Sequence, residues 1–236
     1  MSILSKIWDD ITSVLYPPKC LVCGEVMHIS GTRICTKCFG AISYTRYWAH
    51  SDNPMAEHAR DMQPWIKNGC AMLYFDSYSR PMIHRLKYQR EWYTAQYLGE
   101  LLGAYLRASG LYNTVDVVVP VPIHPLRRIG RTYNQSEYIA IGVASKLGAE
   151  VNMHSLYRSR YTSAQARKSS VDRWSNHNDD IFDMRSVEQL IGKHILLVDD
   201  VYTSGATIFR CLEVMYKHLP QSTFSIATLA TPSQIK

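Results

Sequence analysis

Apolar and polar positions divide the chain into three parts. Between residues 3 and 15 the apolar residues recur at the spacing of one helix face, and Pro17-Pro18 ends that pattern. Residues 46–69 are polar and irregular and contain two further prolines, which favours a linker or a covering segment. We therefore expect an N-terminal module over residues 1–45, a linker or cover over 46–69, and a main domain over 70–236.

In the main domain, short apolar runs alternate with segments of helical periodicity. Runs typical of buried strands cover residues 70–75, 115–121, 195–198 and 224–229. Segments typical of helices cover residues 91–106, 136–147 and 207–218. Residues 155–180 are polar and basic, which predicts an exposed, mobile loop. The alternation predicts an α/β fold with a mostly parallel sheet flanked by helices.

Composition narrows the class of protein. The chain has 236 residues, of which 46% are hydrophobic and 19% are charged, which excludes a disordered or collagen-like chain. No apolar stretch approaches the roughly 18 residues of a membrane span. Asp9 and Asp10 stand where a signal peptide has its apolar stretch, so we expect a cytoplasmic protein.

The positive charge is concentrated in one region. Between His124 and Arg173 nine Lys and Arg face three acids, an excess equal to the net charge of +6 for the whole chain. Such a region is typical of a polyanionic ligand, either the phosphates of a small molecule or a nucleic acid. A solvated basic face is the alternative.

The segment 195–207 combines a buried strand with the chemistry of a sugar-phosphate site. Two carboxylates, Asp199 and Asp200, stand at the carboxyl end of the strand, where ligands of open α/β sheets bind and where carboxylates accept from sugar hydroxyls. A turn leading into a helix follows, and its backbone N–H groups and hydroxyls predict a phosphate cradle made of Thr203, Ser204, Gly205, Ala206 and Thr207. The alternative is an ordinary strand–turn–helix with capping residues.

Four cysteines form two Cys-x2-Cys pairs separated by eleven residues. Such turns point paired sulfurs at a common centre, so a structural zinc ion is expected on Cys20, Cys23, Cys35 and Cys38. A disulfide is disfavoured in a reducing compartment, and a redox pair or His28 in place of one cysteine remain alternatives. Cys70 and Cys211 lie in apolar surroundings and are expected in the core.

Segment 195–207 closely resembles the phosphoribosyl pyrophosphate (PRPP) signature of type I phosphoribosyltransferases. The resemblance implies that Asp199 and Asp200 hold the ribose hydroxyls and that residues 203–207 hold the 5′-phosphate. That family also has a pyrophosphate loop after an earlier strand, here at residues 119–124. The side chains expected to face the pyrophosphate there are His124, Arg127, Arg128 and Arg131; solvated arginines are the alternative.

The whole chain resembles the ComF family of competence proteins. The resemblance rests on the Pro-Pro-x-Cys-x2-Cys start, the second cysteine pair and the C-terminal PRPP signature. Three further segments support it, at residues 83–88, 127–135 and 160–176. Gln89-Arg90-Glu91 and Arg131-Thr132 depart from the family pattern. The resemblance implies a role in DNA uptake during transformation.

Two kinds of function follow from the resemblance. If the chain is an enzyme, it transfers ribose from PRPP, with Mg2+ on the leaving pyrophosphate and with Asp199 and Asp200 as candidate catalytic residues. The polar 155–180 loop is then a candidate lid, and the further candidate phosphate contacts are Lys87, Arg160, Gln165 and Arg173. The alternative is a non-catalytic PRPP sensor or single-stranded-DNA-binding accessory protein, with tyrosines among its arginines for stacking. A weaker hypothesis makes the zinc module a docking surface for a helicase-like motor.

Overall fold

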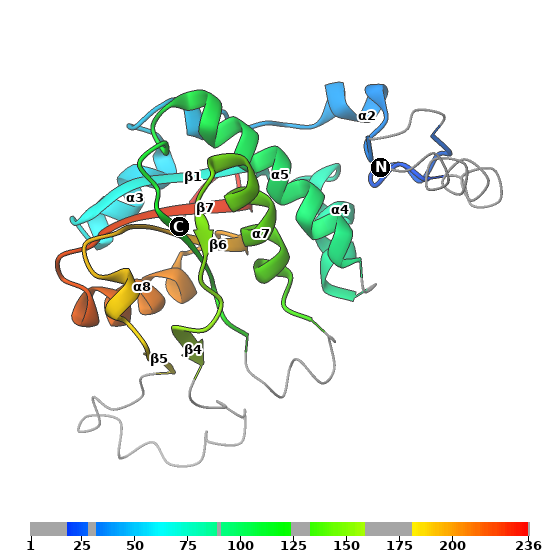
Figure 1. Cartoon of the computed structure of the whole chain (residues 1–236). Helices are drawn as coiled ribbons and strands as arrows, with labels where there is room; N and C mark the ends of the chain where they lie inside the picture. Colours follow the sequence, from blue (N-terminus) through cyan, green and yellow to red (C-terminus); the bar gives the residue numbers. More distant parts are fainter. Residues whose placement is uncertain (1–17, 28–31, 89–90, 124–132, 159–180, 236) are drawn as a thin grey trace, which may run out of the picture.

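The computed structural model describes residues 18–27, 32–88, 91–123, 133–158 and 181–235 (Figure 1). Its centre is a parallel sheet with the strand order β1-β7-β6-β2-β3. These strands are β1 (Ile66–Tyr74), β2 (Val117–Pro120), β3 (Glu150–Val151), β6 (His194–Val201) and β7 (Thr223–Thr231). The predicted α/β fold with a parallel sheet flanked by helices is confirmed.

Helices cover both faces of the sheet. Those nearest the sheet are α3 (Pro54–Met62), α5 (Trp92–Ser109), α7 (Gln135–Leu147) and α8 (Ala206–His218). The connection from β2 to β3 contains α7, and the connection from β6 to β7 contains α8. The two connections run in opposite directions across the sheet. Because such crossovers are right-handed, α7 and α8 lie on opposite faces. Helix α5 packs on α7, whereas α3 lies beside α8, where Gln63 Nε2 donates to the carbonyl of Phe209 at 3.2 Å.

The contact between α5 and α7 depends on glycine. A Cβ on Gly142 would overlap the backbone carbonyl oxygen of Gln96 and would lie 2.6 Å from the backbone nitrogen of Glu100. Glycine lets the two helices approach backbone to backbone.

The N-terminal cysteine module adjoins the edge of the sheet. It consists of a turn closed by an antiparallel bridge between Lys19 and Val26, followed by the short helix α2 (Thr36–Ala41). After α2 the chain runs antiparallel to edge strand β1: Tyr74 donates to the carbonyl of Ser43 at 2.9 Å, and Thr45 donates to that of Met72 at 3.1 Å. These bonds cover part of a sheet edge that would otherwise be unpaired.

The predicted helices and strands of the main domain are confirmed, with boundaries shifted by a few residues. The segment 46–69, predicted to be a linker or a cover, contains a 3-10 turn (Tyr47–Ala49), helix α3 and the first residues of β1. Asn53 caps α3 by accepting from the N–H groups of Met55 and Ala56, and Pro54 occupies the first turn. This capping signal outweighs the polar, irregular composition. The division of the chain into three parts stays a prediction.

Several further elements complete the described chain. Helix α4 (Ser79–Tyr88) lies between β1 and α5, and a 3-10 turn (Glu188–Leu190) precedes β6. Strand β4 (Leu156–Arg158) pairs antiparallel with β5 (Phe182–Met184), so residues 156–158 of the predicted loop are a strand. The rest of that loop from 159 to 180, and the helix predicted over 3–15, lie outside the described residues. Among the described helices, none is long and apolar enough to cross a membrane.

Candidate sugar-phosphate site and cysteine centre

Two acids lie where the strand order of the sheet reverses. Strands β2 and β6 are neighbours, and the chain leaves them in opposite directions, which makes their carboxyl ends the switch point where open α/β sheets bind ligands. Asp199 and Asp200 are among the last residues of β6. The predicted position of this pair at the carboxyl end of the strand is confirmed.

The first turn of α7 holds both acids. Ser136 Oγ donates to Asp199 Oδ1 at 2.9 Å, and Gln135 Nε2 donates to Asp200 Oδ2 at 3.1 Å. Asn134 caps this helix by accepting from the Ser136 N–H, while its own amide donates to the carbonyl of Val121 beyond β2. The side chains of Gln135 and Ser136 therefore orient the acids before any ligand arrives.

The sequence alone does not predict these two partners. Gln135 belongs to a segment that only supports a resemblance, and Ser136 stands at the start of a predicted helix. A helix start that follows the neighbouring strand was the available signal, because parallel neighbours bring their following helices to the same edge of the sheet.

The 203–207 loop joins β6 to α8 beside the acids. A cavity of about 100 Å3 is lined by residues 203–208 together with Asp199 and Val201. Gly205 is the N-cap of α8, with φ of 70° and no side-chain cap bond, so the first N–H groups of the helix remain available to an anion. The structure thus brings the predicted acid and the predicted cradle residues around one cavity.

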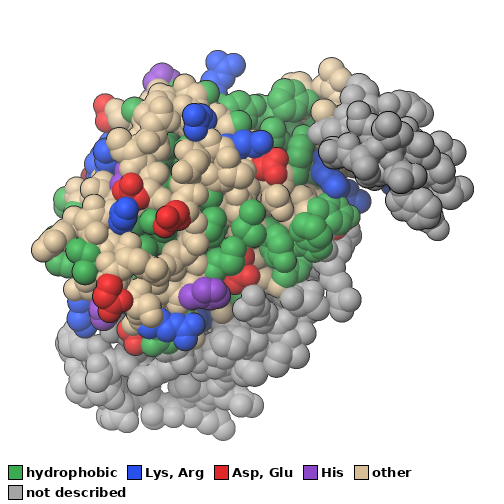
Figure 2. Space-filling model, in the orientation of Figure 1, with side chains coloured by type: hydrophobic (Ala, Val, Ile, Leu, Met, Phe, Trp, Pro, Cys, Tyr) green, Lys and Arg blue, Asp and Glu red, His purple; other side chains and the backbone are tan. Residues whose placement is uncertain are grey.

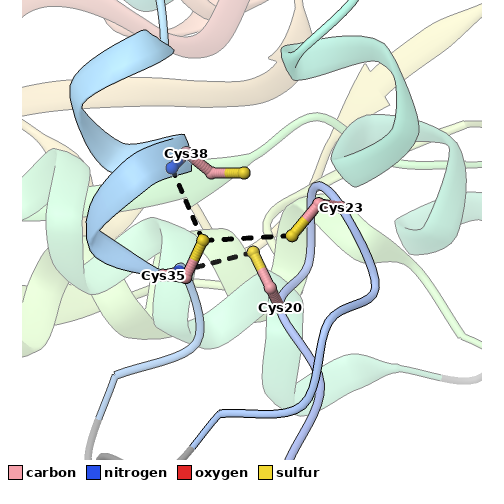
Figure 3. A group of neighbouring side chains, drawn as sticks. All are labelled: Cys20, Cys23, Cys35 and Cys38. Atoms are coloured by element: carbon pink, nitrogen blue, oxygen red, sulfur yellow. Dashed lines mark hydrogen bonds between the residues drawn. The ribbon is translucent and has the colours of Figure 1, made fainter.

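Four cysteine sulfurs gather at the N-terminal module (Figure 3). The ligand atoms of Cys20, Cys23, Cys35 and Cys38 all lie within 4.8 Å of one another, and the sulfurs of Cys23 and Cys35 are 3.9 Å apart. A tetrahedron of sulfurs at about 2.3 Å from a zinc ion has an edge of about 3.8 Å. The donor set and its spacing therefore fit a four-coordinate metal ion.

Backbone N–H groups also point at these sulfurs. Cys35 N lies 3.4 Å from the Sγ of Cys20, and Cys38 N lies 3.5 Å from the Sγ of Cys35. Burial opposes ionisation of Cys20, but N–H groups of Cys35, Cys23 and Val22 outweigh it and lower the pKa of this thiol to about 6. A thiol with this pKa is largely a thiolate at neutral pH, which is the form that binds metal.

Similarity to known proteins agrees with this architecture. The family model described as "Phosphoribosyl transferase domain" matches residues 133–236. Competence protein F of Haemophilus influenzae is 23% identical, over 84% of this chain and 91% of that protein. DNA utilization protein YhgH of Escherichia coli K12 is 27% identical, over 84% of each chain. Residues 133–236 thus match a phosphoribosyltransferase domain, and most of the chain is similar to a competence protein and to a DNA utilization protein. Among solved structures, the allosteric regulatory enzyme of purine biosynthesis aligns with a TM-score of 0.42 and 19% identity, over 61% of this chain and only 30% of that enzyme.

Most of the predicted pyrophosphate or DNA contacts lie outside the described residues. These are His124, Arg127, Arg128, Arg131, Arg160, Gln165 and Arg173. Lys87 belongs to α4, and its side chain is also outside the description. On the face drawn in Figure 2, the described basic and acidic side chains are intermixed. Cys70 and Cys211 are fully buried, which confirms their prediction as core residues.

Proposed function

We propose that this protein binds PRPP together with Mg2+ at Asp199, Asp200 and the 203–207 loop, and that it does so in the service of DNA utilisation. The observation that carries the proposal is the shared cavity: it lies between a carboxylate and the uncapped N-terminus of a helix, at the switch point of a parallel sheet. An acid and an anion site side by side suit a molecule that carries both hydroxyls and a phosphate.

Each part of the site has a task in this proposal. The 5′-phosphate lies at the start of α8, where backbone N–H groups and the helix dipole favour negative charge. The ribose hydroxyls donate to Asp199 and Asp200, whose carboxylates are oriented by Ser136 and Gln135. Ribosyl transfer then needs positioning and exclusion of water more than it needs a protein nucleophile.

Mg2+ fits the chemistry of the donor set. Carboxylate and hydroxyl oxygens, together with substrate phosphates, are the ligands that Mg2+ prefers. When bound, the ion neutralises charge on the departing pyrophosphate. Asp199 and Thr203, which line the cavity, and Asp200 in the last part of β6 are the residues proposed to hold the ion.

The metal of the cysteine module is proposed to be zinc in a structural role. All four ligands are cysteines, which leaves no open position for a substrate or water and is typical of structural zinc. The adjoining residues 43–45 cover the edge of β1, so a metal ion that orders the module also steadies the attachment to the sheet.

The connection to DNA utilisation is supported by the names of the relatives, a competence protein and a DNA utilization protein. Single-stranded DNA and a helicase-like motor stay predicted partners, because the basic segments on which they depend lie outside the described residues. In the organism that carries the gene, its deletion is expected to lower the uptake or use of DNA, and the Asp199→Asn/Asp200→Asn variant is expected not to restore it.

Calorimetric titration with Mg-PRPP tests the binding proposal. The wild type is expected to bind, and Asp199→Asn/Asp200→Asn is expected to bind roughly 100- to 10,000-fold more weakly, since the variant removes two acids and hydrogen bonds to charged groups contribute about 1.5–3 kcal/mol each. Glu213→Gln, at an exposed acid further along α8, is the matched control and leaves affinity unchanged. No binding by the wild type, or equal binding by the double variant, would overturn the proposal. Release of pyrophosphate in an acceptor screen then separates an enzyme from a sensor.

A further inference from the structure

A buried tyrosine and a half-buried histidine lie beneath the 203–207 loop. Tyr202 is completely buried, and its hydroxyl lies 2.7 Å from Nδ1 of His58. His58 belongs to α3, in the segment that the sequence predicted to be a linker or cover. A hydrogen bond therefore joins two segments separated by 144 residues, immediately before the loop begins.

The hydroxyl of Tyr202 and the ring of Phe209 form the floor of the loop. A Cβ on Gly205 would lie 2.5 Å from Cε2 of Phe209 and 2.8 Å from the hydroxyl oxygen of Tyr202. The loop backbone thus rests on these two side chains with no space between them. A shift of either side chain must move the backbone whose N–H groups face the cavity.

Helix α3 fixes this floor from below. The ring of His58 lies 5.9 Å from that of Tyr202, nearly perpendicular to it, and 5.8 Å from that of Phe209. Gln63, which follows the same helix, donates to the carbonyl of Phe209 at 3.2 Å. Because Tyr202 is fully buried, loss of the His58 bond would leave its hydroxyl without a partner and cost free energy.

We propose that His58 is a positioning residue that acts through the Tyr202 hydroxyl to hold the 203–207 loop in the conformation that accepts a phosphate. That the loop binds a phosphate rests on the proposed function, whereas the coupling of His58 to the loop through Tyr202 rests on the geometry alone. Burial raises the pKa of Tyr202 above its usual range, so the phenol keeps its proton and stays able to hydrogen-bond His58.

Hydrogen exchange of the ligand-free protein tests the coupling. Phe209 N donates to the carbonyl of Gly205 at 2.8 Å, so the exchange rate of this amide reports opening of the first turn of α8. We expect Tyr202→Phe and His58→Ala each to raise that rate roughly tenfold, the equivalent of about 1.4 kcal/mol. The double variant is expected to add little to either single variant, and His58→Gln is expected to restore part of the protection.

The control is Tyr112→Phe, which removes the hydroxyl of another fully buried tyrosine remote from the loop. It is expected to leave the exchange of the Phe209 amide unchanged. If Tyr202→Phe and His58→Ala also leave that rate unchanged, or if their effects simply add, the positioning role is wrong.

Titrations with Mg-PRPP and with ribose 5-phosphate separate this inference from the proposed function. Faster exchange with weaker binding of both compounds supports the positioning role, with affinity falling about five- to tenfold. Faster exchange in variants of a wild type that binds neither compound overturns the proposed function and keeps the coupling. Wild-type binding that the variants retain in full, with unchanged exchange, overturns the positioning role and keeps the proposed function.

Discussion

Replacement of Gly205 by alanine tests how closely the 203–207 loop is packed. Gly205 has φ of 70°, a left-handed conformation that disfavours any residue with a Cβ. Its new methyl group would also meet Phe209 at 2.5 Å and Tyr202 at 2.8 Å. Gly148, which ends α7, has nearly the same conformation, with φ of 74°, but nothing lies within 4 Å of its Cβ position. The pair of variants therefore separates backbone strain from packing.

The two costs can be assigned from this geometry. The left-handed conformation costs an alanine about 1–2 kcal/mol at either position. At Gly205 the overpacked contacts add about 1–3 kcal/mol, because Tyr202 and Phe209 have little room to move. We therefore expect Gly148→Ala to lower the free energy of unfolding by about 1–2 kcal/mol and Gly205→Ala by about 2–5 kcal/mol.

Urea unfolding measures both variants against the wild type. For a two-state transition the slope with denaturant stays constant, and the midpoint falls further for Gly205→Ala than for Gly148→Ala. In a chain of this size each kcal/mol lowers the thermal midpoint by about 2–4 °C, which gives an independent reading. Equal losses for the two variants would show that the floor of Tyr202 and Phe209 yields freely, and the packing argument would then be wrong.

Three further results are expected. Cys20→Ser is expected to lower the zinc content of the purified protein from about one equivalent towards zero and to lower its thermal midpoint. The control Cys211→Ala is expected to retain the metal. An unchanged zinc content in Cys20→Ser would contradict the four-cysteine site. Gly142→Ala is expected to lower the free energy of unfolding by about 3 kcal/mol, because the new Cβ meets the backbone of Gln96 and Glu100. Gly40→Ala, where nothing lies near the Cβ position, is expected to raise it by about 0.5–1 kcal/mol. Equal urea midpoints for the two variants would refute this expectation. Burial, with the nearby charge of Lys67, lowers the pKa of His194 to about 4, so the stability held by its neutral form is complete above pH ~6.5 and is lost as pH falls towards 4. The stability of His194→Gln is expected to change less over that window, and parallel pH curves from urea unfolding would count against the assignment.

Sequence patterns predicted the strands β1, β2, β6 and β7 because most of their residues are buried, whereas the short, more exposed strand β3 was not predicted. Residues 195–198 are four apolar residues in a row, and all four are completely buried. Helix α7 was bounded correctly because Gly148 stops it in a left-handed conformation. The acids of β6 and the 203–207 loop were equally accessible, since they are contiguous in the chain and their chemistry is local.

What the sequence did not reveal depends on contacts between distant segments. Gln135 and Ser136 acquire their role only because α7 begins beside the end of β6, 63 residues or more away along the chain. Helix α3 was missed because its composition is polar and its capping residue, Asn53, stands in an irregular segment. Asn53 Nδ2 also donates to the carbonyl of Gly69 in β1, which no local pattern predicts.

The segment between the cysteine module and the sheet connects the two candidate sites physically. Ser43 and Thr45, which immediately precede the predicted linker 46–69, pair with edge strand β1 and stand five and seven residues beyond the last cysteine, Cys38. Its helix α3 contacts the floor of the 203–207 loop through His58. Packed segments of this kind move together, because a well-packed interior leaves few voids in which one element can shift alone. A segment that is a linker by composition is therefore a structural support of both sites, and substitutions in it are expected to affect phosphate binding without touching the ligand.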